Sequence, residues 1–237
     1  MAISFRTPLV LVVVLSVAAS NGFGQFADKV ADTPHNLRKA TQGSMANLGI
    51  RDYGDVCVYC HLQHELNSSL QTQLWNRVLP TTLYLMYDSP IMARKVAGSP
   101  DSTSLVCLSC HDGSIPLDAV KKVPTTHIES GASNVTISSC SNTCHTASNP
   151  SGGISFEGGN MGSDLRNHHP IGIRYDAAKN PDLHRPSGGK VNGLPLYGPN
   201  STQVGCGSCH EPHDNSRRPF LRISNNDAAL CLACHDM

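Results

Sequence analysis

The chain has 237 residues, of which 39% are hydrophobic and only 5% aromatic, and it carries 20 glycines and 15 prolines. Its 18 basic residues balance 18 acidic ones, which argues against a nucleic-acid binder, and no apolar run beyond the N-terminus approaches the length of a membrane span. A chain this poor in apolar side chains is expected to need disulfides, metals or a large cofactor to fold. The 10 cysteines and 12 histidines are the residues to examine for that role.

Residues 1–24 have the form of a secretory signal peptide. Arg6 supplies a positive start, an apolar segment covers Leu9–Ala19, and the small residues that follow suit cleavage. An uncleaved membrane anchor is the alternative, but the apolar segment is short for a span. We therefore expect an exported protein, located in the periplasm, outside the cell or at the cell surface. In such an oxidising compartment, cysteines usually form disulfides.

Four cysteine pairs instead repeat one pattern, in which two residues separate the cysteines and a histidine follows the second. The copies are Cys57, Cys60 and His61; Cys107, Cys110 and His111; Cys206, Cys209 and His210; and Cys231, Cys234 and His235. This is the attachment signal of c-type haem. The two thiols on one turn reach the two vinyl groups of the porphyrin, and the adjacent imidazole becomes the proximal iron ligand. Zinc ribbons or disulfides are the alternatives, and neither explains a histidine at the same place in every copy.

The last two cysteines, Cys140 and Cys144, are followed by His145 with one extra residue between the cysteines. We interpret this as a further haem-attachment motif on a stretched loop, the third of five in chain order, which leaves no cysteine unassigned. A disulfide between Cys140 and Cys144 is the alternative.

Histidines are numerous enough to give every haem two axial ligands. Five six-coordinate haems need ten ligands, and the motifs supply half of them. The histidines outside the motifs are His35, His64, His127, His168, His169, His184 and His213. We predict His35, His64, His127, His169 and His213 as distal ligands, and His168 and His184 as the spares. Met45, Met86, Met92 and Met161 are alternative ligands that the supply of histidine makes unnecessary.

Two of these histidines, His64 and His213, each lie three residues after a motif histidine. On a short helix, positions three apart share a face, whereas a distal ligand must approach from the opposite side of the porphyrin. His64 therefore cannot readily complete the haem that His61 holds, nor His213 that of His210. Each is free to bind a different haem, which predicts haems stacked closely together.

The chain divides into a signal peptide, 1–24, and one multihaem domain, 25–237. Within it we distinguish a two-haem unit (25–139), the stretched motif with a Gly- and Pro-rich segment (140–205), and a second two-haem unit (206–237). We expect a mostly irregular fold with short α-helices at the haem motifs, and with the chain of haems as its core. A helix over Leu62–Asn76 and a small strand within 191–197 are further expectations.

The sequence resembles the multihaem c-type cytochromes with doubled haem motifs from metal-reducing and related anaerobic bacteria. The matching segments are Cys57–His64 with Leu74–Arg77, Cys107–Gly113, His169–Ile171, Gly205–His213, and Phe220–Arg222 through Ala229–Cys231. The resemblance implies bis-histidine haems of low reduction potential in a continuous chain that transfers electrons. It also implies that His169, rather than His168, is an iron ligand.

The sequence is further similar to extracellular cytochromes that polymerise into filaments. In those proteins a histidine trailing an early motif completes a haem of the neighbouring subunit, and the matching residue here is His64. The chain departs from them in its number of haems and in the Cys140–Cys144 spacing.

We therefore expect a pentahaem electron carrier, with five covalently attached haem c groups and no catalytic residues. Its expected partners are other redox proteins or cytochromes, further copies of itself, and an extracellular metal oxide as terminal acceptor. The alternative is a multihaem reductase of the nitrite or hydroxylamine type. Such an enzyme needs one open iron face, and in the similar nitrite reductases one motif carries lysine in place of histidine, which no motif here does.

Overall fold

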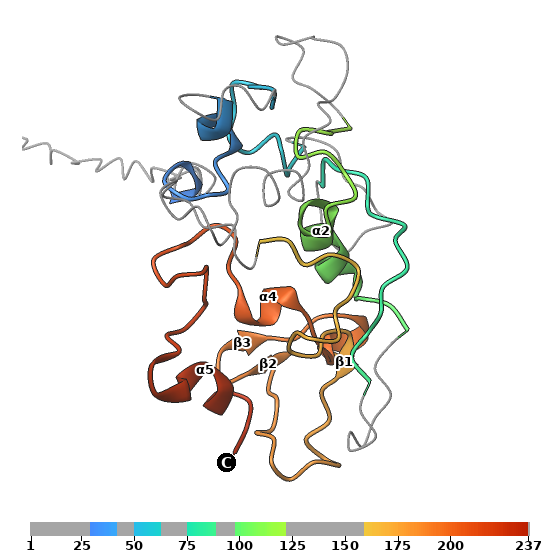
Figure 1. The fold of residues 1–237 in the computed structure, drawn as a ribbon. Helices are drawn as coiled ribbons and strands as arrows, with labels where there is room; N and C mark the ends of the chain where they lie inside the picture. The colour runs from blue at the N-terminus through green and yellow to red at the C-terminus, as the bar shows by residue number, and fades with distance from the viewer. Residues whose placement is uncertain (1–28, 42–49, 63–74, 89–97, 122–158, 237) are drawn as a thin grey trace, which may run out of the picture.

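The computed structural model describes residues 29–41, 50–62, 75–88, 98–121 and 159–236. These residues form an elongated column of loops with short helices and two small sheets (Figure 1). The predicted signal peptide lies outside the described residues. No helix in the described ranges has both the length and the apolar character needed to cross a bilayer.

The longest described helix, α2 (Ser102–His111), carries the second motif. Asp101 is the N-cap of this helix, because its side-chain oxygen accepts hydrogen bonds of 3.0 Å from the backbone N–H groups of both Thr103 and Ser104. The other described helices are η1 (Leu37–Thr41), η4 (Pro199–Ser201), α4 (Cys206–Cys209), η5 (Asn226–Ala228) and α5 (Ala229–Leu232). The fourth and fifth motifs thus also contain short helices, as the sequence predicts.

The first motif is not a helix, which corrects that part of the prediction. It forms a turn in which the N–H of His61 donates to the carbonyl of Cys57 over 2.8 Å. After His61 the backbone pairs with Trp75 as an antiparallel bridge, so the chain leaves the turn in an extended form. The predicted helix over Leu62–Asn76 is wrong at its end for the same reason, because Trp75 and Asn76 are not helical. Residues 63–74 lie outside the described part.

Both sheets have two antiparallel strands of two residues each. Strand β1 (Ile173–Arg174) pairs with β4 (Gln203–Val204), with Ile173 opposite Val204. Strand β2 (Lys190–Val191) pairs with β3 (Leu194–Pro195). A hairpin therefore replaces the single strand expected within 191–197. Asn192 and Gly193 make its turn with φ values of 45° and 89°, which is the backbone form that an Asn-Gly pair favours.

The hydrophobic core is divided into small clusters rather than one layer. Tyr175, Val191, Leu196 and Val204 pack around the sheets, with Cys234 against them. Tyr53, Val58 and Tyr59 form a second cluster that contacts Cys60. Each cluster therefore supports a cysteine of one motif.

Candidate functional site

In the first, fourth and fifth motifs the backbone closes one helical turn and then pairs with a distant segment. The N–H of His61, His210 and His235 donates to the carbonyl of the first cysteine over 2.8, 3.1 and 2.9 Å. The same histidines form isolated antiparallel bridges with Trp75, Leu221 and Leu183, respectively. The backbone of each of these histidines is therefore held by the turn before it, which carries the two thiols, and by the distant segment with which it pairs.

None of the eight described motif cysteines forms a disulfide. Burial raises the pKa of the Cys60 thiol to about 12 and that of Cys234 to about 11, so both are protonated near neutral pH. In the described part of the chain, no three His, Cys, Asp or Glu side chains converge as they would around a metal ion. These cysteines are thus arranged as pairs, each with its own histidine.

The four described motifs follow one another in a row. Cys60 lies within electrostatic range of Cys110, and Cys209 within range of Cys231. The thiols of Cys107 and Cys206 interact with each other, which raises the pKa of Cys107 and lowers that of Cys206. In Figure 1 the row descends from the first motif through α2 and α4 to α5.

Glycines allow the fourth motif to pack closely against its neighbours. A Cβ atom at Gly205 would lie 2.7 Å from Oδ2 of Asp101, at the start of α2, and one at Gly207 would lie 2.7 Å from the hydroxyl oxygen of Tyr197. The N–H of Cys206 donates to Oγ of Ser104 over 3.1 Å. The residues around the fourth motif thus hold α4 directly on α2.

Pairs of imidazole rings from distant parts of the chain lie close to each other beside this row. The ring centroids of His61 and His213 are 6.0 Å apart, and those of His35 and His111 are 6.1 Å apart. Two imidazoles bound on opposite sides of one metal ion, each at about 2.0 Å, have centroids roughly 6 Å apart. His169 lies within electrostatic range of His235. The residues present therefore fit a metal held between two histidines at the first and second motifs.

Five of the described histidines donate from Nδ1 to an oxygen acceptor. His35 donates to the carbonyl of Pro212, His111 to Gly159, His169 to Pro170, His210 to Pro219, and His213 to the carboxylate of Glu211, over 2.5 to 3.1 Å. A carbonyl or carboxylate oxygen only accepts, so Nδ1 carries the hydrogen and the lone pair stays on Nε2. This is the tautomer of a histidine whose Nε2 binds a metal.

Burial also favours the neutral form of these rings. It lowers the pKa of His35 to about 4, and it lowers the pKa values of His61 and His111. These imidazoles are therefore neutral near pH 7, as iron ligands must be.

Comparison with known proteins finds a family match for the last two motifs of this row. Residues 198–237 match the family model of the doubled CXXCH motif. The match covers the fourth and fifth motifs together and supports a c-type cytochrome family with covalently bound haem c. No curated protein matches the chain.

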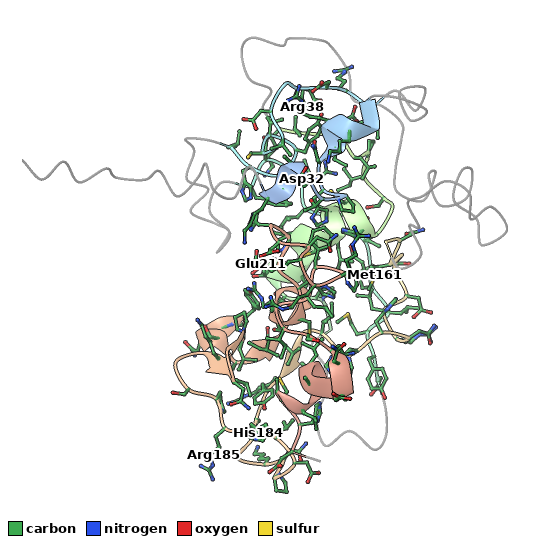
Figure 2. All side chains as sticks on the ribbon, turned by 90° about the vertical axis from the view of Figure 1, so that its left-hand side faces the viewer. Asp32, Arg38, Met161, His184, Arg185 and Glu211 are labelled. Carbon is green, nitrogen blue, oxygen red and sulfur yellow. The ribbon has the colours of Figure 1, made fainter. Side chains whose placement is uncertain are left out.

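The structure places the other predicted residues as follows. His184 and Arg185 lie at one end of the molecule, Asp32 and Arg38 lie at the other end, and Glu211 of the doubled CXXCH segment lies between them (Figure 2). His168 is exposed, and the backbone N–H of His184 donates to the carbonyl of Cys234 over 3.0 Å. Cys140, Cys144, His145, His64 and His127 lie outside the described residues.

Sequence reasoning missed the groups that orient the histidines. Glu211 lies between His210 and Pro212, and it belongs to none of the motifs found in the sequence. Its carboxylate accepts from Nδ1 of His213 over 2.9 Å and from Nη1 of Arg222 over 2.8 Å. The hydrogen bond from His213 lowers the pKa of Glu211 to about 2. The acidic residue two positions before a predicted ligand was the available signal.

Proposed function

We propose that the chain is a pentahaem c-type cytochrome that transfers electrons along closely spaced haems with two histidine ligands each. One observation carries the proposal. The thiol pairs form a single row, and beside its first two members the centroids of paired imidazole rings are 6.0 and 6.1 Å apart. Covalent haem supplies a one-electron iron couple, and the chain's own residues hold and shield it.

The proposed ligand pairs are His61 with His213, His111 with His35, and His235 with His169. A pair of histidines closes both faces of an iron, which supports electron transfer rather than substrate turnover. The reductase alternative requires an open face. The doubled CXXCH family is generally one of electron carriers, which agrees with this choice.

The holoprotein tests this function by mass and by optical spectrum. We expect five haem additions, with Cys140 and Cys144 holding one of them. The spectrum of the assembled holoprotein should be entirely low-spin, and it should not change with carbon monoxide or nitrite. Four additions with a disulfide would refute the haem at Cys140 and Cys144. A high-spin fraction with nitrite turnover would refute the function as an electron carrier.

We further propose that the protein is exported and that His64 binds a haem of a neighbouring copy. Among the described residues, no histidine ring lies opposite His210 in the way that His35 lies opposite His111. His64 trails the first motif as His213 trails the fourth, and His213 lies opposite the histidine of a distant motif. The haem of His210 is therefore the one that we assign to His64.

His64→Ala should leave one haem high-spin and should prevent assembly. Electron microscopy of the secreted fraction would show filaments for the wild type and none for the variant. His168→Ala is the matched control, because His168 is an exposed histidine outside the proposed pairs. A wild-type monomer that is already fully low-spin, with His64 bound internally, would overturn ligation between copies.

A further inference from the structure

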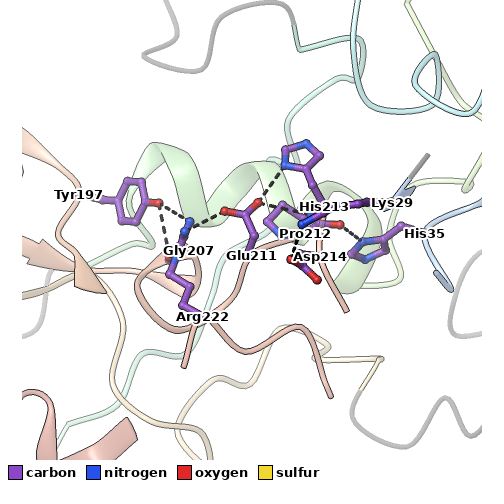
Figure 3. Close-up of polar contacts among 9 residues, drawn as sticks. All are labelled: Lys29, His35, Tyr197, Gly207, Glu211, Pro212, His213, Asp214 and Arg222. Atoms are coloured by element: carbon purple, nitrogen blue, oxygen red, sulfur yellow. Dashed lines mark hydrogen bonds and ion pairs between the residues drawn. The ribbon is translucent and has the colours of Figure 1, made fainter. Parts of the chain in front are cut away.

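The ring of His213 contacts a carboxylate side chain, that of Glu211 (Figure 3). Its Nδ1 donates to Oε1 of Glu211 over 2.9 Å, and the two side chains form an ion pair when His213 is protonated. The backbone N–H of His213 points to the same oxygen over 3.4 Å. Glu211 thus holds both the ring and the backbone of this residue.

The acceptor of His213 differs from those of the other histidines. In the part of the chain that the structure describes, His35, His111, His169 and His210 donate from Nδ1 to backbone carbonyls, which are neutral. His213 donates to a carboxylate. A charged acceptor makes a stronger hydrogen bond than a neutral one and draws the ring proton further from the imidazole.

The carboxylate of Glu211 is itself fixed in place. Arg222 donates from Nη1 to Oε2 of Glu211 over 2.8 Å. Arg222 also donates from Nε to the carbonyl of Gly207 over 2.7 Å, and its Nη2 lies 3.4 Å from the hydroxyl of Tyr197. Arg222 therefore links the Glu211 carboxylate to the backbone of the fourth motif and holds it in position relative to His213.

We propose that Glu211 is a positioning residue that lowers the reduction potential of the haem attached at Cys57 and Cys60. An imidazole with more negative charge stabilises the oxidised iron, so that iron accepts an electron less readily. The proposal rests on the proposed function, because it requires His213 and His61 to bind the same iron.

The effect makes the row of haems asymmetric. The first motif is at one end of the described row, and the fifth motif, which contains α5, is at the other (Figure 1). A lower potential at the first motif favours the movement of electrons away from it toward the fourth and fifth motifs.

Glu211→Gln in the full holoprotein tests this assignment. Glutamine keeps the length and an oxygen acceptor but removes the charge. In a redox titration we expect the transition of one haem to move upward while the others stay in place. A tenfold change in the ratio of oxidised to reduced haem at fixed potential corresponds to about 59 mV for a one-electron couple. Nuclear magnetic resonance of the haem substituents would identify the haem that shifts.

Asp214→Asn is the matched control for charge. Asp214 is next to His213, but its Oδ2 accepts from Lys29 over 2.7 Å, and the substitution removes the same unit of charge. We expect it to move the same transition less than Glu211→Gln does. Equal shifts in both variants, or no shift in Glu211→Gln, would overturn the role of Glu211.

The wild-type holoprotein supplies a measurement that needs no variant. In the reduced, diamagnetic state, the Nδ1 proton of His213 should resonate furthest downfield among the ring N–H protons of the ligand histidines. If the Nδ1 proton of another ligand histidine resonated furthest downfield, the proposal would be overturned. Failure of the proposed function is distinguishable, because the haem of the wild type would then lack a low-spin spectrum with two histidine ligands.

Discussion

Without covalently attached haem, the polypeptide is expected to be largely unfolded. The helices α4 and α5 have four residues each, and every described strand has two. Helices this short are unstable alone, and fixing each residue costs roughly 1–2 kcal/mol of conformational entropy. The buried apolar side chains of the described residues form small separate clusters, which is too little to offset that cost.

The apoprotein can be produced in a reducing cytoplasm that lacks haem attachment. Far-UV circular dichroism should then show mostly unordered chain, and amide resonances should have little dispersion. The holoprotein under the same reducing conditions is the control, because its thioether bonds persist. A cooperative thermal transition of the apoprotein would show that the polypeptide has a sufficient core of its own.

Replacing Arg77 by alanine should strongly destabilise the holoprotein. The Arg77 side chain is 0% exposed and lies between the first two motifs. It donates to the carbonyls of Ser109, Pro116 and Leu117 over 2.8, 2.9 and 2.7 Å. Alanine would remove the donor of the Ser109 and Leu117 carbonyls, while the Pro116 carbonyl still accepts from the N–H of Ala119. Each buried unsatisfied group costs about 1–3 kcal/mol, and the lost packing of the buried side chain adds to this. We expect a loss of about 3 kcal/mol or more in the free energy of unfolding.

Chemical denaturation of the holoprotein measures this loss. Arg166→Ala is the control, since Arg166 is 56% exposed and pairs with Asp164 only two residues away. The control should leave the denaturation midpoint unchanged. Similar midpoints for the two variants would show that Arg77 does not join the first two motifs.

The sequence predicted the local form of the motifs well, because that form depends on neighbouring residues. Asp101 is a strong N-cap ahead of the second motif, and a helix begins after it. Ahead of the first motif, Asp55 accepts from the N–H of Cys57 over 2.8 Å, which is the same two-residue step, and Asp52 accepts from that of Gly54 over 2.8 Å, yet this motif forms a turn. The helices α4 and α5 form without a side-chain cap bond at their N-cap residues. A cap alone therefore does not decide which motif becomes helical.

The sequence did not predict which histidines from distant parts of the chain pair with each other. The spacing of His210 and His213 predicts that His213 serves another motif, but it does not indicate which one. The contact with His61 depends on how α4 packs against α2, which Gly205 permits because it has no Cβ. Similarly, nothing local connects His35 with His111. The ligand pairs follow from packing between distant segments, and one sequence alone does not contain that information.

The separation of His61 and His213 also bears on the order of maturation. A chain synthesised from its N-terminus presents Cys57, Cys60 and His61 long before His213 exists. His35, in contrast, precedes His111, its partner across 6.1 Å. With the proposed ligand pairs, the haem of the second motif would receive both ligands early, whereas the haem of the first motif would wait for nearly the whole chain. The haem of the first motif would then be among the last to be closed to solvent and to reactive small molecules.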